Sequence, residues 1–130
     1  MGGAIAGIVV THGNLAEALI RTAEVIVGKQ EDVSAIAGAD LNDEEIIKRI
    51  REIVTGRPDG RALVFVDFFG GSCCTNSQRA AVGSPGVRII SGVNLPMLLD
   101  FATKRRTMGF DEMVEHLIRR GRESIKLVVL

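Results

Sequence analysis

The sequence predicts an α/β fold, in which a parallel sheet is covered by helices on both faces. Four short apolar runs, rich in β-branched residues, alternate with segments of helical period, and this alternation is typical of that fold class. The chain has 130 residues, a common size for one domain, and no linker long enough to separate two domains. We therefore expect residues 1–130 to form a single domain with a three-layer, doubly wound sheet.

The four apolar runs are the expected strands. They lie at Ala4–Val10, Val33–Ile36, Ala62–Val66 and Val87–Ile90. Because helical segments separate them, we expect crossover connections and parallel strands. The common strand order for such a sheet is 2-1-3-4, which places the first and third strands side by side.

The first two helices carry recognisable start signals. Leu15–Val27 places its apolar residues along one stripe, with Asn14 as the expected N-cap. The second helix begins after Asn42 and has Glu45 at its third position, and this pair predicts a capping box. Gly56 marks the end of that helix.

The second half of the chain predicts three further helices and a terminal strand. A short helix covers about Thr75–Val82, Pro96 fits the first position of a helix that reaches about Arg106, and Phe110–Ser124 is amphipathic. The tail Ile125–Leu130 is apolar and β-prone. Such a strand has to be covered, either by joining the edge of its own sheet or by pairing with a second copy in a homodimer.

The composition excludes several classes of protein. The 16 Lys+Arg balance the 16 Asp+Glu, and Trp and Tyr are absent, so we expect no nucleic-acid binding. Apolar runs fall far short of the roughly 18 residues that a membrane span requires, and we expect a cytoplasmic protein. Cys73 and Cys74 are adjacent and poorly placed to close a loop, so we expect them to stay thiols.

Residues that can do chemistry follow the first and third expected strands. His12 lies two residues past Val10, and Asp67 comes directly after Val66. Ligands of open α/β sheets bind beyond the carboxyl ends of strands where the strand order reverses, so both side chains are expected in one crevice. A carboxylate there holds one ring nitrogen protonated and makes the other more basic. The alternative is a structural histidine at a strand end, with Asp67 capping a turn.

A glycine-rich loop adds a third element to this end of the sheet. Gly70 and Gly71 allow backbone N–H groups to turn toward an anion, and the helix that follows contributes its positive end. Ser72 can donate a hydrogen bond to the same anion. With His12 and Asp67 nearby, the set predicts a histidine that carries phosphate.

Other patterns are weaker. His116 falls off the apolar stripe of its helix, so we expect a solvated surface residue. Two histidines on separate elements and cysteines without ligand spacing predict no metal site. Cys73 and Arg79 have the Cys-x5-Arg spacing of cysteine phosphatases, which gives a rival enzyme, although the residues between them read as the start of a helix.

Four motifs in order resemble a known family. They are Ile8-Val9-Val10-Thr11-His12-Gly13, Val66-Asp67-Phe68-Phe69-Gly70-Gly71-Ser72, Ser91-Gly92-Val93-Asn94-Leu95-Pro96-Met97-Leu98 and Gly121-Arg122-Glu123. With them the chain resembles the IIA domain of the mannose family of the bacterial phosphoenolpyruvate-dependent sugar phosphotransferase system. The similarity runs nearly end to end.

This resemblance implies a phosphotransferase component that needs no cofactor. His12 would accept a phosphoryl group from the phosphocarrier HPr and pass it to a IIB domain for sugar uptake and phosphorylation. Asp67 matches an aspartate that hydrogen-bonds one ring nitrogen and leaves the other, expected to be Nε2, as the nucleophile; Ser72 matches a serine of the active-site loop. The family's sheet gains a fifth, antiparallel strand from the partner subunit, and contact with the membrane is only indirect, through transporter subunits.

Five residues flank the expected crevice and are candidates for docking HPr and IIB; they are Phe68, Phe69, Leu95, Pro96 and Met97. The alternative for each is packing beneath the loop.

One residue departs from the family pattern. Cys73 stands where the family usually has proline, which puts the rigidity of the loop in question and introduces a group sensitive to oxidation. The alternative function is a regulatory module, in which a partner reads the phosphorylation state of His12 without a dedicated transporter.

Overall fold

Four parallel strands form one sheet in residues 4–130, the part of the chain that the computed structural model describes. Their order is β2-β1-β3-β4, as the sequence predicts. The strands are β1 (Ala6–Thr11), β2 (Val33–Ala37), β3 (Ala62–Val66) and β4 (Val87–Ser91). The expected α/β architecture is therefore confirmed.

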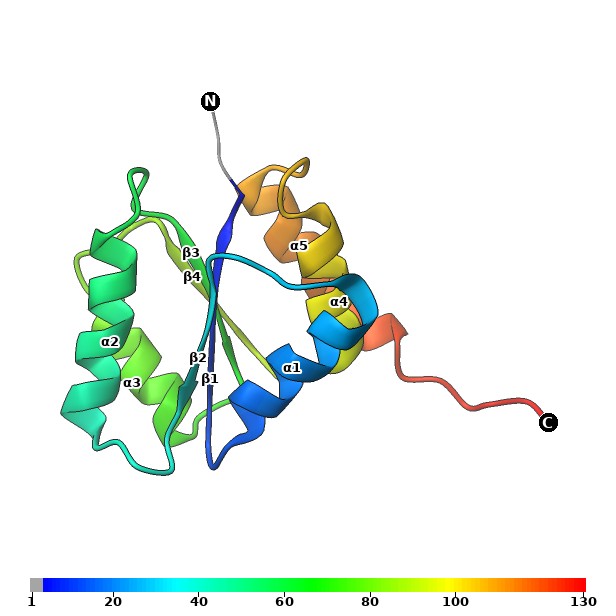
Figure 1. Cartoon of the computed structure of the whole chain (residues 1–130), viewed down its shortest axis with the longest axis horizontal. Helices are drawn as coiled ribbons and strands as arrows, with labels where there is room; N and C mark the ends of the chain where they lie inside the picture. Colours follow the sequence, from blue (N-terminus) through cyan, green and yellow to red (C-terminus); the bar gives the residue numbers. More distant parts are fainter. Residues whose placement is uncertain (1–3) are drawn as a thin grey trace.

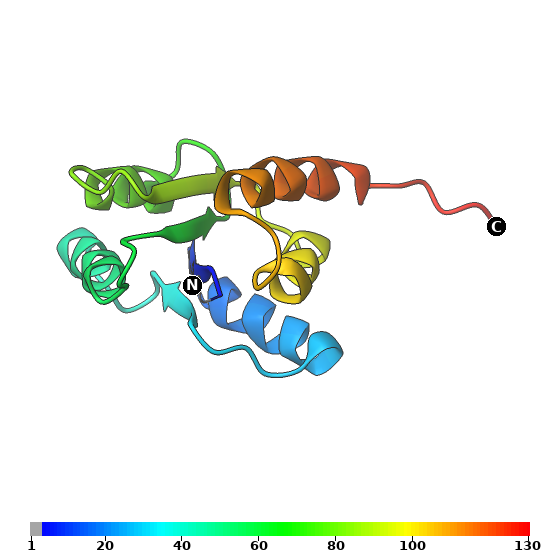
Figure 2. The same ribbon diagram turned by 90° about the horizontal axis from the view of Figure 1, so that it is seen from above.

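Helices cover both faces of the sheet (Figure 1). One layer consists of α2 (Asp43–Thr55) and α3 (Ser72–Ala80), and the other consists of α1 (Leu15–Val27), α4 (Leu95–Lys104) and α5 (Phe110–Glu123). Figure 2 shows the same two layers from above. Each layer closes its own apolar core against the sheet. Among residues 4–130, no helix is long and apolar enough to cross a membrane.

The register of the sheet aligns the ends of the strands. Val10 of β1 pairs with Ile36 of β2 on one side and with Val66 of β3 on the other. Val66 in turn pairs with Ser91 of β4. Because these strands are parallel, the residues that follow β1 and β3 emerge at the same edge of the sheet.

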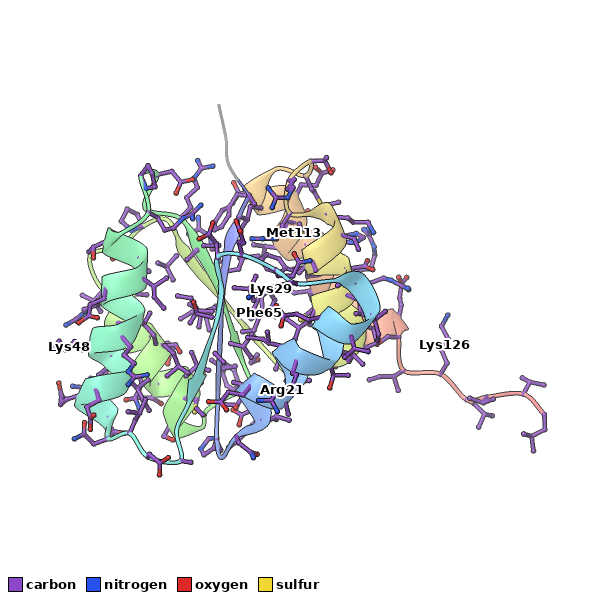
Figure 3. All side chains as sticks on the ribbon, viewed as in Figure 1. Arg21, Lys29, Lys48, Phe65, Met113 and Lys126 are labelled. Atoms are coloured by element: carbon purple, nitrogen blue, oxygen red, sulfur yellow. The ribbon has the colours of Figure 1, made fainter. Side chains whose placement is uncertain are left out.

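Glycine at position 7 allows a close contact between the sheet and α4. A Cβ atom at Gly7 would lie 2.6 Å from Cε2 of Phe101, which is only 1% exposed. The Phe101 ring packs edge-on against Phe65, with 5.1 Å between ring centroids. Phe65 lies inside the molecule, whereas Lys48 on α2 points outward (Figure 3).

The start of α2 is capped as the sequence predicts, whereas the start of α1 is stabilised by a different side chain. The capping box of α2 is confirmed, since Asn42 Oδ1 accepts from Glu45 N at 2.9 Å and Asn42 N donates to Glu45 Oε1 at 3.3 Å. Asn14 stands at the N-cap position of α1, as expected, but its side chain makes no capping hydrogen bond. Instead the buried Thr11 hydroxyl, at the end of β1, accepts from Ala16 N at 2.7 Å.

Two further helices begin earlier than the sequence predicts. α3 starts at Ser72 and not at Thr75, because the extended backbone of Gly71 serves as its N-cap. α4 starts at Leu95, so Pro96 occupies the second helical position. The cap of α4 is Asn94, whose Oδ1 accepts from Met97 N at 3.1 Å.

A buried arginine holds the opposite end of the sheet together. Arg105, directly after α4, is 1% exposed. Its guanidinium donates to Ile5 O at 2.9 Å, to Glu31 O, and to Gln30 Oε1 at 3.2 Å. These bonds join the segments that lead into β1 and β2, and they satisfy a charged group that would otherwise be costly to bury.

The C-terminal tail extends away from the rest of the chain (Figure 1). Residues 125–130 form no strand within their own sheet, and Leu127 and Val129 are 93% and 90% exposed. In the single chain, the tail therefore does not join the edge of its own sheet, which was the first of the two expected ways to cover it.

Candidate active site

His12 is fixed by Asp67 through two hydrogen bonds. Asp67 Oδ2 accepts from the His12 backbone N–H at 2.9 Å and lies 2.8 Å from ring nitrogen Nδ1. The other carboxylate oxygen accepts from the Phe68 backbone N–H at 3.1 Å. Both residues follow adjacent parallel strands, and the structure brings them together as the strand order predicts.

Hydrogen bonding keeps Asp67 ionised. Burial by itself raises the pKa of this carboxyl, whose side chain is 12% exposed. The opposing contributions are larger in sum: the bonds from the backbone and ring of His12, the charge of His12 and the Phe68 N–H leave the pKa of Asp67 below its usual value of 3.8. Asp67 is therefore a carboxylate at neutral pH.

The other edge of the imidazole faces Ser72. Ser72 Oγ, in the first turn of α3, lies 3.1 Å from His12 Nε2. The His12 side chain is 48% exposed, so this edge is open to a molecule arriving from solvent.

An aromatic side chain covers one face of the imidazole. The Phe68 ring stacks on His12 with 5.2 Å between ring centroids and 23° between ring planes. Glycine beside it leaves space for this ring position, because a Cβ atom at Gly71 would lie 2.6 Å from Phe68 Cζ. Gly71 thus makes room for the ring that holds His12 in its orientation.

The first turn of α3, which begins at Ser72 beside Nε2, has free backbone N–H groups. The first hydrogen bond within this helix runs from Thr75 N to Gly71 O at 3.0 Å, so the N–H groups ahead of it have no partner within the helix. Gly70 has φ of 84°, the left-handed conformation that glycine adopts most readily. This turn directs the chain into α3 with the positive end of the helix near His12.

Cys73 contacts the imidazole, which the sequence alone did not indicate. Its Sγ lies 3.7 Å from His12 Nδ1, and its side chain is buried. Burial, aided by the negative charge of Asp67, raises the pKa of the Cys73 thiol to about 11. This disfavours the thiolate and argues against the expected sensitivity to oxidation.

The Cys-x5-Arg interpretation lacks its geometry. Cys73 and Arg79 lie within the continuous helix α3, and not on a loop that could surround a phosphate. Arg79 Nη2 pairs with Glu44 Oε1 on α2 at 3.1 Å. The thiol is protonated and the arginine is engaged elsewhere, so the structure does not support a cysteine phosphatase.

The five candidate docking residues differ in exposure. Phe69 is 81% exposed and Phe68 is 51% exposed, whereas Leu95 and Pro96 are half-buried. Met97 is 3% exposed, and its methyl group packs against Gly121 of α5. The docking expectation for Met97 is wrong, because its side chain belongs to the core between α4 and α5.

The expectation of a solvated His116 is also wrong. Its side chain is 16% exposed, and Nε2 lies 2.7 Å from Asp100 Oδ2 on α4. Lys104 and Arg120 bind the same carboxylate at 3.6 and 3.3 Å. His116 is thus part of an ionic network between α4 and α5, outside the candidate site.

Comparison with known proteins decides the family. A family model described as the PTS system fructose IIA component matches residues 6–118. The chain belongs to this family. The resemblance of this IIA chain to the mannose-family IIA domain, inferred from its four motifs, is therefore confirmed.

Relatives of the IIA chain include curated proteins and solved structures. It is 34% identical over 125 residues to the PTS system mannose-specific EIIAB component of Escherichia coli K12. The aligned region covers 94% of this chain but only 39% of that protein. It is 29% identical over 107 residues to the PTS system sorbose-specific EIIA component of Klebsiella pneumoniae, covering 82% of this chain and 78% of that one. The crystal structure of phosphotransferase system component EIIA from Streptococcus agalactiae has a TM-score of 0.86 and 27% identity, covering 94% of this chain and 95% of that one.

Proposed function

We propose that this IIA domain is a phosphoryl carrier, in which His12 accepts phosphate from phospho-HPr and passes it to a IIB domain for sugar uptake and phosphorylation. The observation that carries the proposal is the double hydrogen bond between His12 and Asp67, with Nε2 beside Ser72 on the exposed side of the ring. The family match and the mannose- and sorbose-specific relatives support it.

Asp67 selects the nucleophilic nitrogen. A carboxylate only accepts hydrogen bonds, so the Nδ1 atom 2.8 Å from Asp67 carries the ring proton. In the neutral ring, Nε2 then holds the free electron pair and accepts a hydrogen bond from Ser72 Oγ. Nε2 is therefore the atom that attacks phosphorus.

The transfer exchanges one phosphorus–nitrogen bond for another. As the bond to the donor's imidazole breaks, the bond from phosphorus to His12 Nε2 forms on the opposite side, in line. Nδ1 keeps its proton, so the His12 ring gains positive charge, which Asp67 stabilises. Transfer to the IIB domain runs the same exchange in the other direction and restores His12.

The loop and α3 stabilise charge on the phosphoryl oxygens. Gly70 and Gly71 lead directly into the N-terminus of α3, whose free N–H groups and positive end favour an anion. The Ser72 hydroxyl rotates from Nε2 to a phosphoryl oxygen once the new bond forms. These groups are in place before the phosphate arrives, so little reorganisation is needed.

The partners meet an exposed aromatic surface beside His12. Phe68 stacks on the His12 ring, its neighbour Phe69 is 81% exposed, and aromatic residues are common anchors of protein interfaces. HPr and the IIB domain dock over these two residues, with Leu95 and Pro96 at the rim.

The IIA chain forms a homodimer by exchanging its C-terminal strand. β4 is an edge strand, and a hollow of about 390 Å³ runs between Ile89–Gly92 and α5. The apolar tail Ile125–Leu130 begins at this hollow and is exposed in the single chain. The tail of a second copy pairs antiparallel with β4, covering both the unpaired edge and the apolar side chains.

The test is phosphorylation by the donor proteins. Incubation with phosphoenolpyruvate, enzyme I and HPr, followed by intact-mass measurement, should show one acid-labile phosphate on the wild type and none on His12→Ala. His116→Ala is the matched control, since it removes the other histidine and should still gain the phosphate. A wild-type chain that gains no mass would refute the proposal.

Transport is favoured over the regulatory alternative. Both uses require the same phosphohistidine, but the relatives at 34% and 29% identity are named as mannose- and sorbose-specific components. Transfer from phosphorylated IIA to an isolated mannose-family IIB domain, followed by mass measurement, tests the transport role directly.

A further inference from the structure

Three potential metal ligands converge on the inner edge of the His12 ring. His12 Nδ1, a carboxylate oxygen of Asp67 and Cys73 Sγ all lie within 4.8 Å of one another. They come from the segment after β1, the segment after β3 and the first turn of α3. The fold brings these three residues together from separate segments, so the spacing of residues in the sequence does not reveal the cluster.

One ligand pair is already spaced as in a tetrahedral zinc site, and a second pair has to open. Zinc binds nitrogen and oxygen at about 2.0–2.2 Å and sulfur at about 2.3 Å, which separates a tetrahedral N,S pair by about 3.6 Å and an N,O pair by about 3.4 Å. Nδ1 and Sγ are already 3.7 Å apart. Nδ1 and Asp67 Oδ2 are 2.8 Å apart, so this hydrogen-bonded pair has to open by about 0.6 Å to admit the ion.

The donor atoms favour a particular class of cation. Imidazole nitrogen, thiolate sulfur and one carboxylate oxygen form a borderline-soft set that suits Zn²⁺, whereas Mg²⁺ and Ca²⁺ require oxygen ligands. Cys73 is 2% exposed and the Asp67 side chain 12%, whereas the His12 side chain is 48% exposed, so the cluster lies just beneath the surface on the His12 side. Three protein ligands leave the fourth position to water.

We propose that His12, Asp67 and Cys73 form a binding site for Zn²⁺, and that the bound ion prevents His12 from accepting phosphate. The binding itself stands on the geometry of the three ligands. The inhibition rests on the proposed function, because it concerns the same imidazole.

Inhibition follows from the electron pairs of the ring. Zn²⁺ takes the pair on Nδ1, so the ring proton moves from Nδ1 to Nε2. The Cys73 thiol releases its proton to solvent as sulfur binds the ion, and one proton leaves per ion bound. Nε2 now carries a hydrogen in place of its free pair, and it cannot attack phosphorus.

Cobalt provides a direct test of the ligand set. Co²⁺ added to the purified chain should give a near-ultraviolet thiolate-to-cobalt charge-transfer band that excess Zn²⁺ removes and Mg²⁺ does not. Cys73→Ser should abolish the band and weaken Zn²⁺ binding by at least about 100-fold, the upper range seen on losing a residue that only orients a ligand. Cys74→Ser is the matched control, because Cys74 is buried in the same helix but lies outside the cluster, and it should keep the band.

Phosphorylation with and without Zn²⁺ tests the inhibition. In the wild type and in Cys74→Ser, the phosphorylation rate with Zn²⁺ should be at least tenfold lower than the rate without it, and a chelator should restore the rate. In Cys73→Ser the two rates should be nearly equal. A cobalt band that survives Cys73→Ser, or its absence from the wild type, overturns the metal site even if phosphorylation is normal. A chain that binds cobalt but is never phosphorylated, even without metal, refutes the proposed function and leaves the metal site standing.

Discussion

Replacing Asp67 by asparagine tests how the histidine is prepared for transfer. Asp67 Oδ2 accepts two hydrogen bonds from His12, and Oδ1 accepts one from Phe68 N. An amide has one accepting oxygen, so Asp67→Asn in its better orientation keeps the two bonds from His12 and turns its NH₂ group against the Phe68 N–H. In the opposite orientation, the NH₂ group faces Nδ1 and forces the ring proton onto Nε2.

Both orientations slow phosphoryl transfer. The first removes the negative charge that stabilises the imidazole as it gains positive charge, and the second removes the electron pair from Nε2. By analogy with the orienting aspartate of a serine protease triad, whose loss costs about 10⁴ in rate, we expect transfer to slow by about 10²–10⁴-fold. This corresponds to roughly 2.7–5.4 kcal/mol in the activation barrier. Phe68 is exposed, so its N–H can bond water instead, and the lost bond should lower the free energy of unfolding by about 0.5–1.5 kcal/mol.

The assay is single-turnover transfer from phospho-HPr, followed by rapid quenching and intact-mass measurement, with denaturant unfolding of the same samples. Asp100→Asn is the matched control, because Asp100 also binds a histidine ring, at 2.7 Å, but lies outside the site. It should transfer at the wild-type rate. A folded Asp67→Asn variant with a rate within threefold of the wild type would refute this account of the carboxylate.

Acid titration provides an independent check on the same residue. The folded-state pKa of Asp67 is lower than its usual value of 3.8, so the carboxylate stabilises the folded chain above that pH. This stabilisation is lost as the pH falls through the lowered pKa. As the pH falls from above 3.8 through the lowered pKa, the wild type should therefore lose more stability than Asp67→Asn. Equal losses would contradict the role of the His12 hydrogen bonds in lowering the pKa.

Three further changes test other parts of the molecule. Gly7→Ala forces a Cβ to within 2.6 Å of Phe101 in a packed core, and denaturant unfolding should show a loss of about 1–3 kcal/mol. His116→Ala removes one bond from the Asp100 network, and should cost about 1 kcal/mol in unfolding while leaving the mass gain on phosphorylation intact. Deletion of residues 126–130 should convert the proposed dimer to a monomer by light scattering, and a dimer that survives the deletion would rule out strand exchange.

The sequence predicts the features that depend on local pattern and on strand order. The capping box of Asn42 and Glu45 is a contact within one helical turn, so spacing is enough to find it. His12 and Asp67 are far apart in the chain, yet each directly follows an apolar strand, and parallel pairing brings such positions together.

Contacts between elements are what the sequence does not reveal. Asn14 occupies the N-cap position of α1, but the side chain that accepts from a first-turn N–H is Thr11, at the end of β1. The apolar stripe of α5 shows which residues face the core, but it does not show that Asp100 on α4 lies beside His116. The contact of Cys73 with the imidazole likewise depends on α3 starting directly after Gly71, which propensity does not predict.

Arg105 lies at the end of the sheet opposite the candidate site, where its bonds tie together the segments that lead into β1 and β2. The residues that hold the strands together and the residues of the candidate site therefore lie at opposite ends of the sheet. Segments at the His12 end of the sheet that carry no site residue can change in sequence while the anchor keeps the strands aligned, so docking surfaces can vary around the same histidine without loss of the fold.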